Sequence, residues 1–83
     1  TALFIDGNKA QLARDAASGQ GETLDALAAL LKVDAADKAA FVSLTKARHA
    51  EIFASVESAD SIATRLKAAL QSDARLAKYA EAV

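Results

Sequence analysis

Glycine and proline are both missing from the chain after Glu22, which leaves most of the sequence without a strong helix breaker. Alanine, the residue with the highest helix propensity, supplies 23 of the 83 residues. The sequence therefore predicts an all-α fold, a compact orthogonal or up-down bundle of four to five short helices. Its length suits a single helical domain over residues 1–83.

The larger apolar side chains are few, so the core is expected to be lean and to rely on close helix contacts through alanine faces. Their helical spacing predicts a core of Leu12, Leu24, Leu27, Leu31, Phe41, Leu44, Ile52, Ile62, Leu66, Leu70 and Leu76. Tyr79 is expected to hold the last helix against the body, with its hydroxyl at the surface.

Helix-boundary signals divide the chain at a few points. We expect breaks near residues 19–21, 33–34, 55–58 and 71–73. The first helix is predicted from about Lys9, and a start that reaches back through Phe4 and Ile5 is the alternative. The third is expected to reach about Ala54, and the last, short helix to start at Ser72 or Asp73.

Individual residues predict how these helices begin and end. Asn8 is expected to be an N-cap with Gln11 at capping-box spacing. Gly19 is expected to end the first helix in a left-handed conformation. Asp34 is expected to cap the third helix and to pair with Lys38. Ser58 is expected to cap the fourth.

Charge and composition exclude several functional classes. Ten basic residues oppose eleven acidic ones, so the chain lacks the basic surface that nucleic acids require. The longest apolar run, Ala26 to Leu31, is too short to cross a bilayer, which predicts no membrane insertion. Cysteine is absent, which removes disulfide, thiolate and cysteine-based zinc chemistry.

Several short motifs together resemble a family of small bacterial proteins called domain of unknown function 3015, over essentially the whole chain. The motifs are Phe4-Ile5-Asp6-x-Asn8, Gln11-Leu12-Ala13-x-Asp15, Gly19-Gln20-Gly21-Glu22-x-Leu24 with Leu27-Ala28, and Asp73-x-x-Leu76-Ala77-Lys78-Tyr79. The turn from Gly19 to Glu22 is the most specific of them.

The resemblance implies an exported, periplasmic protein, of which this chain corresponds to the C-terminal helical part. It also implies a signal peptide and an N-terminal segment outside this chain. The resemblance also implies a Gly-Cys or similar pair after the second helix, where this chain has Lys32-Val33, so it implies no disulfide at this point. The family has no established catalytic or binding residues, so the resemblance implies none here.

Two features invite a functional interpretation. His49, the single histidine, could act as a base or metal ligand, but its position at the edge of an apolar helix face favours a half-buried structural residue. The segment from Gly19 to Glu22 could form an anion-binding nest. Glu22 would repel a phosphate, so a helix cap followed by a turn is the favoured interpretation.

The remaining reactive side chains also favour structural roles. The hydroxyls considered as nucleophiles are Ser18, Ser43, Thr45, Ser55 and Ser61, and none has a convincing base partner. The carboxylates considered as cation ligands are Asp15, Asp25, Asp34 and Asp37, which are expected to be helix caps or solvated groups. Lys46, Arg48 and Glu51 are expected to form a solvated face of mixed charge.

The missing catalytic motifs and the balanced charge, together with the export that the family resemblance implies, predict a non-enzymatic exported domain of the periplasm or envelope that acts through protein–protein contacts. They predict no catalytic residue, no cofactor and no metal site. One alternative is a small apolar-ligand carrier with a cleft between alanine-rich helices, lined by Phe41, Leu44, Phe53 and Leu66. The least supported alternative is an enzyme whose site needs a segment outside this chain. An exposed apolar patch would favour partner binding.

Overall fold

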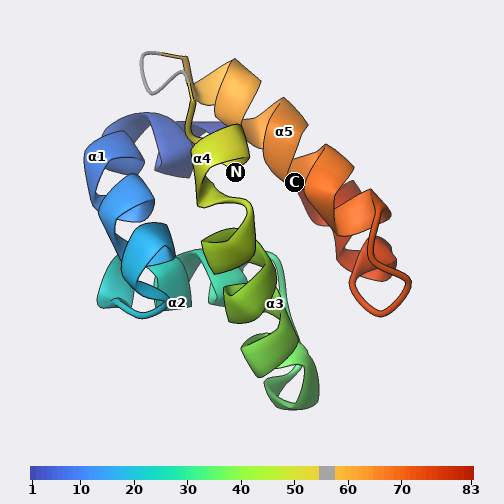
Figure 1. Ribbon diagram of the computed structural model, residues 1–83. Coiled ribbons are helices and arrows are strands. Elements are labelled where there is room, and N and C mark those ends of the chain that lie inside the picture. The colour runs from blue at the N-terminus through green and yellow to red at the C-terminus, as the bar shows by residue number, and fades with distance from the viewer. Residues whose placement is uncertain (55–57) are drawn as a thin grey trace.

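The computed structural model describes residues 1–54 and 58–83, and every regular element in these ranges is helical (Figure 1). In chain order they are α1 (Ala2–Ser18), α2 (Glu22–Leu30), α3 (Ala35–Ala47), α4 (His49–Ile52), α5 (Ala59–Gln71) and the 3₁₀ helix η1 (Ala77–Ala82). The predicted all-α class is confirmed, and so are the breaks near residues 19–21, 33–34 and 71–73.

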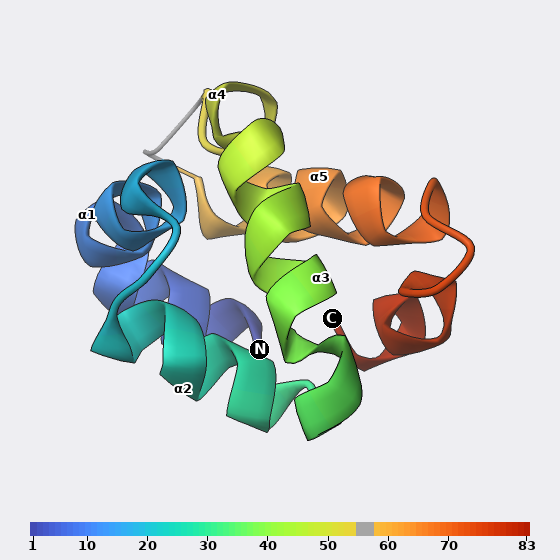
Figure 2. The same ribbon diagram turned by 60° about the horizontal axis from the view of Figure 1, so that its bottom comes forward.

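The helices cross one another rather than running up and down. Figure 2 shows α3 lying across the directions of both α2 and α5, and η1 folded back along α5. α1 packs against α2, α3, α4 and α5, so it is the element around which the bundle is assembled. The molecule measures 30 × 21 × 21 Å along its principal axes.

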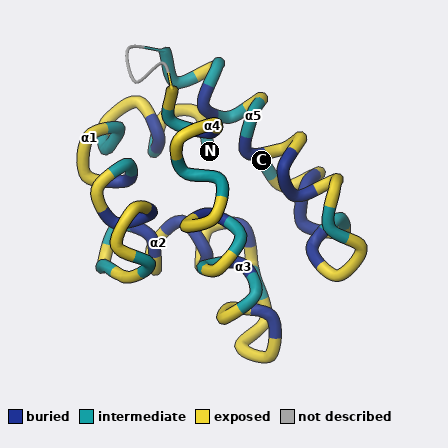
Figure 3. The backbone as a smooth tube through the Cα atoms, viewed as in Figure 1, coloured by how far each residue is buried: buried dark blue, intermediate teal, exposed yellow. Residues whose placement is uncertain are grey.

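The core matches the predicted apolar positions closely. Figure 3 shows buried stretches alternating with exposed ones along the helices, as expected when one face of each helix packs inward. All predicted core residues are buried except Leu44, which is half-buried. Ile5 is also fully buried, although the sequence did not mark it as core. Alanines complete the interior as expected, because Ala16, Ala28, Ala69 and Ala80 are each at most 3% exposed.

α1 starts earlier than the cap signal at Asn8 predicted. Asn8 has non-helical backbone angles (φ −134°, ψ 20°) and kinks the helix rather than starting it. Its side-chain Nδ2 donates to the carbonyl of Phe4 at 2.8 Å, whereas Gln11 donates to Asp15. The predicted capping box is therefore wrong, and the alternative start, with the helix reaching back through Phe4 and Ile5, is confirmed. Burial of Ile5 explains the longer helix, since it stabilises the turn before Asn8.

α1 ends as predicted, at a glycine in the left-handed region. Gly19 has φ 77° and ψ 21°. Its amide donates to the carbonyl of Ala16 at 3.2 Å, and the amide of Gln20 donates to that of Asp15 at 3.2 Å. These two bonds form a Schellman motif, which satisfies carbonyls that the helix end would leave unpaired.

α2 ends in the same motif without a glycine. Lys32 has φ 59°, and among the described residues it is the one non-glycine residue with positive φ. Its amide donates to the carbonyl of Ala29 at 3.1 Å, and Val33 donates to that of Ala28 at 3.0 Å. A side chain with a Cβ is strained in this conformation, so a glycine would fit this position with less strain.

The third predicted helix is divided in the structure. Arg48 leaves helical geometry (φ −113°, ψ 17°), and α4 follows as a separate turn that still buries Ile52. Asp34 takes the N-cap position of α3 as predicted, but its side chain makes no capping hydrogen bond. Lys38 pairs with Asp25 of α2 at 3.0 Å rather than with Asp34. The predicted pair within α3 is therefore replaced by a pair that joins α3 to α2.

The beginning of α5 follows its polar signal, whereas the last helix does not start at Ser72 or Asp73 as predicted: residues 72–76 form a turn, and the 3₁₀ helix η1 begins at Ala77. Ser58 caps α5 as predicted, with its Oγ accepting from the amide of Ser61 at 3.2 Å. Residues 55–57, which were part of the predicted break, lie outside the described residues. Asp73 Oδ1 accepts from the amides of Arg75 and Leu76, and η1 begins after this turn.

Candidate functional site

Asp15 fills the concave turn that could have bound an external anion. It lies in the last turn of α1 and is only 6% exposed. Its Oδ2 accepts from the amides of Thr23 at 3.0 Å and Leu24 at 3.2 Å, at the start of α2. Its Oδ1 accepts from Gln11 at 3.1 Å. Asp15 is therefore a cap, but for the following helix, where its charge also suits the positive end of the helix dipole.

Gly21 allows this carboxylate to reach the turn. It has φ 145°, and a Cβ built at this position would overlap the carboxylate carbon and both oxygens of Asp15. The close approach explains the second glycine of the motif, whereas Gly19 is explained by its left-handed backbone. The turn is a structural junction whose anion-binding amides are occupied by the chain itself.

A second buried carboxylate, Asp37, holds the C-terminal segment. Its side chain is 9% exposed and lies in the first turn of α3. Oδ2 accepts from the hydroxyl of Tyr79 at 2.5 Å and lies 3.3 Å from Nζ of Lys78. Oδ1 accepts from Nε of Arg75 at 2.6 Å. Asp37 was expected to be a cap or a solvated group, and Tyr79 to expose its hydroxyl, so both expectations were wrong.

The hydrogen bonds fix the ionisation of this cluster. The hydroxyl of Tyr79 and the guanidinium of Arg75 hold the pKa of Asp37 at about 2, below its usual 3.8. The same bond and the burial of the ring raise the pKa of Tyr79 above 10. At neutral pH an ionised carboxylate therefore faces a neutral phenol and two cations. All three partners bond to the one carboxylate of Asp37, so the cluster stabilises the fold.

The other candidates are also engaged in local contacts. His49 is half-buried, and its Nδ1 lies 2.8 Å from the carbonyl oxygen of Lys46. A carbonyl only accepts, so this nitrogen carries the proton. The hydroxyl of Thr45 is buried and donates to Val42 at 2.9 Å. Arg48 and Glu51 approach within 3.8 Å on the predicted face of mixed charge.

No metal-binding arrangement is found in residues 1–54 and 58–83, because no three acidic, histidine or cysteine side chains there lie close enough to hold an ion. Asp25 pairs with Lys38, and Ser18 Oγ lies 3.1 Å from the carbonyls of both Asp15 and Gln20. Ser43 is exposed. Ser55 lies outside the described residues.

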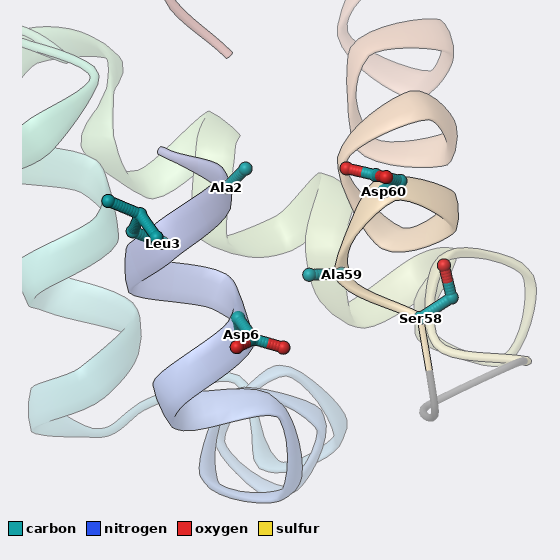
Figure 4. Close-up of a pocket in the computed structure, with 6 residues that line it drawn as sticks. All are labelled: Ala2, Leu3, Asp6, Ser58, Ala59 and Asp60. Atoms are coloured by element: carbon teal, nitrogen blue, oxygen red, sulfur yellow. The ribbon is translucent and has the colours of Figure 1, made fainter.

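A cleft of about 370 Å³ lies between the N-terminal ends of α1 and α5 (Figure 4). It is lined by Ala2, Leu3, Asp6, Ser58, Ala59 and Asp60. Figure 4 shows Asp6 extending towards α5 and Asp60 extending towards α1. Two carboxylates in the lining disfavour an apolar ligand, because burying them under it would cost their hydration. The four residues expected to line a carrier cleft do not line this one.

Leu3 is the most exposed large apolar side chain in the described part of the chain, at 89%. It lies at the rim of the cleft and points away from α5 (Figure 4). Leu30, at the end of α2, is 45% exposed. Leu3 and Ile5 both lie in the first turns of α1, where Ile5 is buried in the core. The helix therefore holds the side chain of Leu3 in its exposed position. These residues are candidates for contacts outside the molecule.

Comparison with known proteins places the chain in a family. A family model described as "Protein of unknown function (DUF3015)" matches residues 1–80. The chain belongs to this family. The predicted resemblance is thus confirmed for nearly the whole chain. No curated protein and no solved structure matches it. In the described ranges, no helix has the length and hydropathy that a membrane span requires.

Proposed function

We propose that this DUF3015 chain is a non-enzymatic domain of an exported, periplasmic protein and that it acts by binding another protein. One observation carries the proposal: the two buried carboxylates, Asp15 and Asp37, bond to other parts of the chain and stabilise the fold. Asp15 is bonded to the start of α2, and Asp37 to the C-terminal segment. All fully buried side-chain nitrogen and oxygen atoms in the described residues have a partner. The surface is then the part of the molecule left for function.

The exposed leucine at the start of α1 is the contact we assign to the partner. Apolar side chains at a protein interface lose their contact with water, which favours association. Leu3 is held by a helix that buries Ile5, so little order is lost when a partner covers it. The periplasmic location rests on the family resemblance described above.

Photo-crosslinking in the cells of origin tests the proposal. A photoreactive amino acid replaces Leu3 in the full-length protein, and a matched control replaces Ala10, which is exposed on the same helix. We expect a discrete protein adduct from position 3 and not from position 10. Excess wild-type protein should compete for the adduct, whereas the Leu3→Ser protein should compete poorly. A folded protein that gives the same adducts from both positions would contradict the assignment.

Cell fractionation tests the location separately. We expect the full-length protein in the periplasmic fraction, released by mild outer-membrane disruption. Recovery in the cytoplasmic fraction alone, with a periplasmic marker correctly released, would contradict the export part of the proposal and leave the partner assignment to the crosslinking result.

A further inference from the structure

The C-terminal segment, residues 73–83, is attached to the rest of the molecule in a restricted way. The backbone of η1 approaches α5 and no other helix in the described part of the chain. Figure 2 shows the segment leaving the end of α5, turning, and returning beneath it. Its buried side chains, Leu76, Tyr79 and Ala80, belong to the same apolar cluster as Leu70 of α5. The segment therefore covers part of the core from one side.

Its side-chain attachments converge on the start of α3, and one further bond, from the hydroxyl of Thr1 to the carbonyl of Ala82, joins it to the beginning of α1. Asp37 accepts hydrogen bonds from Tyr79 and Arg75 and lies within 3.3 Å of Lys78, so one carboxylate bonds three side chains of the segment. Arg75 Nη2 also donates to the carbonyl of Ala36 at 2.6 Å. The amide of Asp34 donates to the Tyr79 hydroxyl at 3.2 Å. All these contacts would break together if the segment moved away from α3.

We propose that residues 73–83 form a C-terminal latch that opens as a unit about the turn after Gln71, and that Asp37 holds it closed. The latch uncovers apolar surface of α5 while the remaining helices stay folded. Opening of this kind is expected where a terminal element has few packing partners and is held by one group of polar bonds. The proposal does not depend on the function proposed above, because its test measures only opening.

The cysteine-free chain makes the opening measurable by thiol labelling. Ala80→Cys places a reporter in the latch, where the native side chain is 1% exposed. Ala28→Cys places a matched reporter in α2, where the native side chain is 3% exposed. Both substitutions replace a small buried side chain with another small one, and the labelling rate with a disulfide reagent measures how often each position opens.

Two substitutions of buried carboxylates distinguish a latch from global unfolding. Asp37→Asn removes the contact that holds the latch, whereas Asp15→Asn removes one that remains intact when only the latch opens. We expect Asp37→Asn to accelerate labelling at position 80 by at least about tenfold, the effect of losing charge-assisted hydrogen bonds. Asp15→Asn should leave the rate at position 80 unchanged and accelerate labelling at position 28.

The proposal is overturned if Asp15→Asn accelerates position 80 as much as Asp37→Asn does, because both positions would then open only by unfolding the whole chain. It is equally overturned if Asp37→Asn leaves position 80 unchanged. Should Asp37→Asn fail to fold, Arg75→Gln removes the guanidinium that donates to Asp37 and to the carbonyl of Ala36, at a side chain that is 57% exposed. The same comparison with Asp15→Asn then applies.

Discussion

The hydroxyl of Tyr79 donates a 2.5 Å hydrogen bond to Oδ2 of Asp37, joining residues 42 positions apart. The bond links the last helix to the first turn of α3. It is also a spectroscopic opportunity, because Tyr79 is the chain's one tyrosine and tryptophan is absent. Ultraviolet absorbance of the phenolate therefore follows the ionisation of Tyr79 alone.

We expect the absorbance titration of Tyr79 to have a midpoint above 10 in the folded protein, because the bond to Asp37 and burial both favour the neutral phenol. Asp37→Asn should lower the midpoint towards 10. Since the folded state raises this pKa, stability should fall as the pH rises above 10. Circular dichroism at each pH confirms that the fold persists. A midpoint of 10 in the folded wild type would contradict the contact.

The low pKa of Asp37 predicts how the free energy of unfolding changes at acid pH. Its pKa of about 2 lies below the usual 3.8, so its contribution is present above pH 3.8 and is lost as the pH falls through 2. Urea unfolding of the wild type and of Asp37→Asn between pH 5 and 2 measures this contribution as the difference between the two proteins. We expect the difference to shrink below about pH 4. If the difference in unfolding free energy stayed constant down to pH 2, the stability lost in Asp37→Asn would not depend on the charge of Asp37.

The two glycines of the first turn should differ in their tolerance of alanine. Gly19→Ala should cost about 1 kcal/mol, because it forces a Cβ into a left-handed conformation and meets only the flexible side chain of Lys46. Gly21→Ala should cost more than about 2 kcal/mol, because its Cβ would displace the buried carboxylate of Asp15. Chemical denaturation of both variants gives the comparison. A stability gain for Gly19→Ala would refute the left-handed cap.

Lys32→Gly should stabilise the protein by about 1 kcal/mol, because it relieves the positive φ at the end of α2. Lys67→Gly is the matched control, since it places the same substitution at an exposed position within α5. It should destabilise by about 1 kcal/mol. Thermal and urea unfolding of the two variants should therefore move in opposite directions. Loss of stability in both would mean that Lys32 contributes contacts that outweigh its strain.

His49→Ala should preserve partner binding and change stability by at most about 1–2 kcal/mol, the loss of some packing and one hydrogen bond. The crosslinking yield from position 3 measures binding, and circular dichroism checks the fold. A folded His49→Ala protein that had lost partner binding or another cellular activity would overturn the structural role assigned to this histidine. Stoichiometric metal in the purified wild type would do the same.

The apolar core could be predicted because its signal is local. Leu24, Leu27 and Leu31 repeat at helical spacing, so their shared face follows from the geometry of one helix. Gly19 was predictable for the same reason, since a helix end and its glycine are adjacent in the chain. Leu44 had a core spacing but is half-buried, because burial also depends on what packs against the helix.

The polar interior could not be predicted because its partners are distant in sequence. Asp37 has the same local context as an ordinary helix-start carboxylate, and its burial is decided by Arg75 and Tyr79, 38 and 42 positions away. The motif containing Tyr79 was visible, but nothing in it indicated which carboxylate it contacts. At Asn8 a good local cap signal lost to the burial of Ile5, as tertiary packing often overrides local preference.

The hydroxyl of Thr1 donates to the carbonyl of Ala82 at 3.0 Å, and both ribbon views place the two chain ends close together (Figures 1 and 2). The helices could therefore keep their arrangement in space if their order along the chain were changed. A short linker could join the ends, and a new start could be opened elsewhere, as circularly permuted domains tolerate when their ends meet. The same geometry would let the whole domain be inserted into a surface loop of another protein with little disturbance to its host.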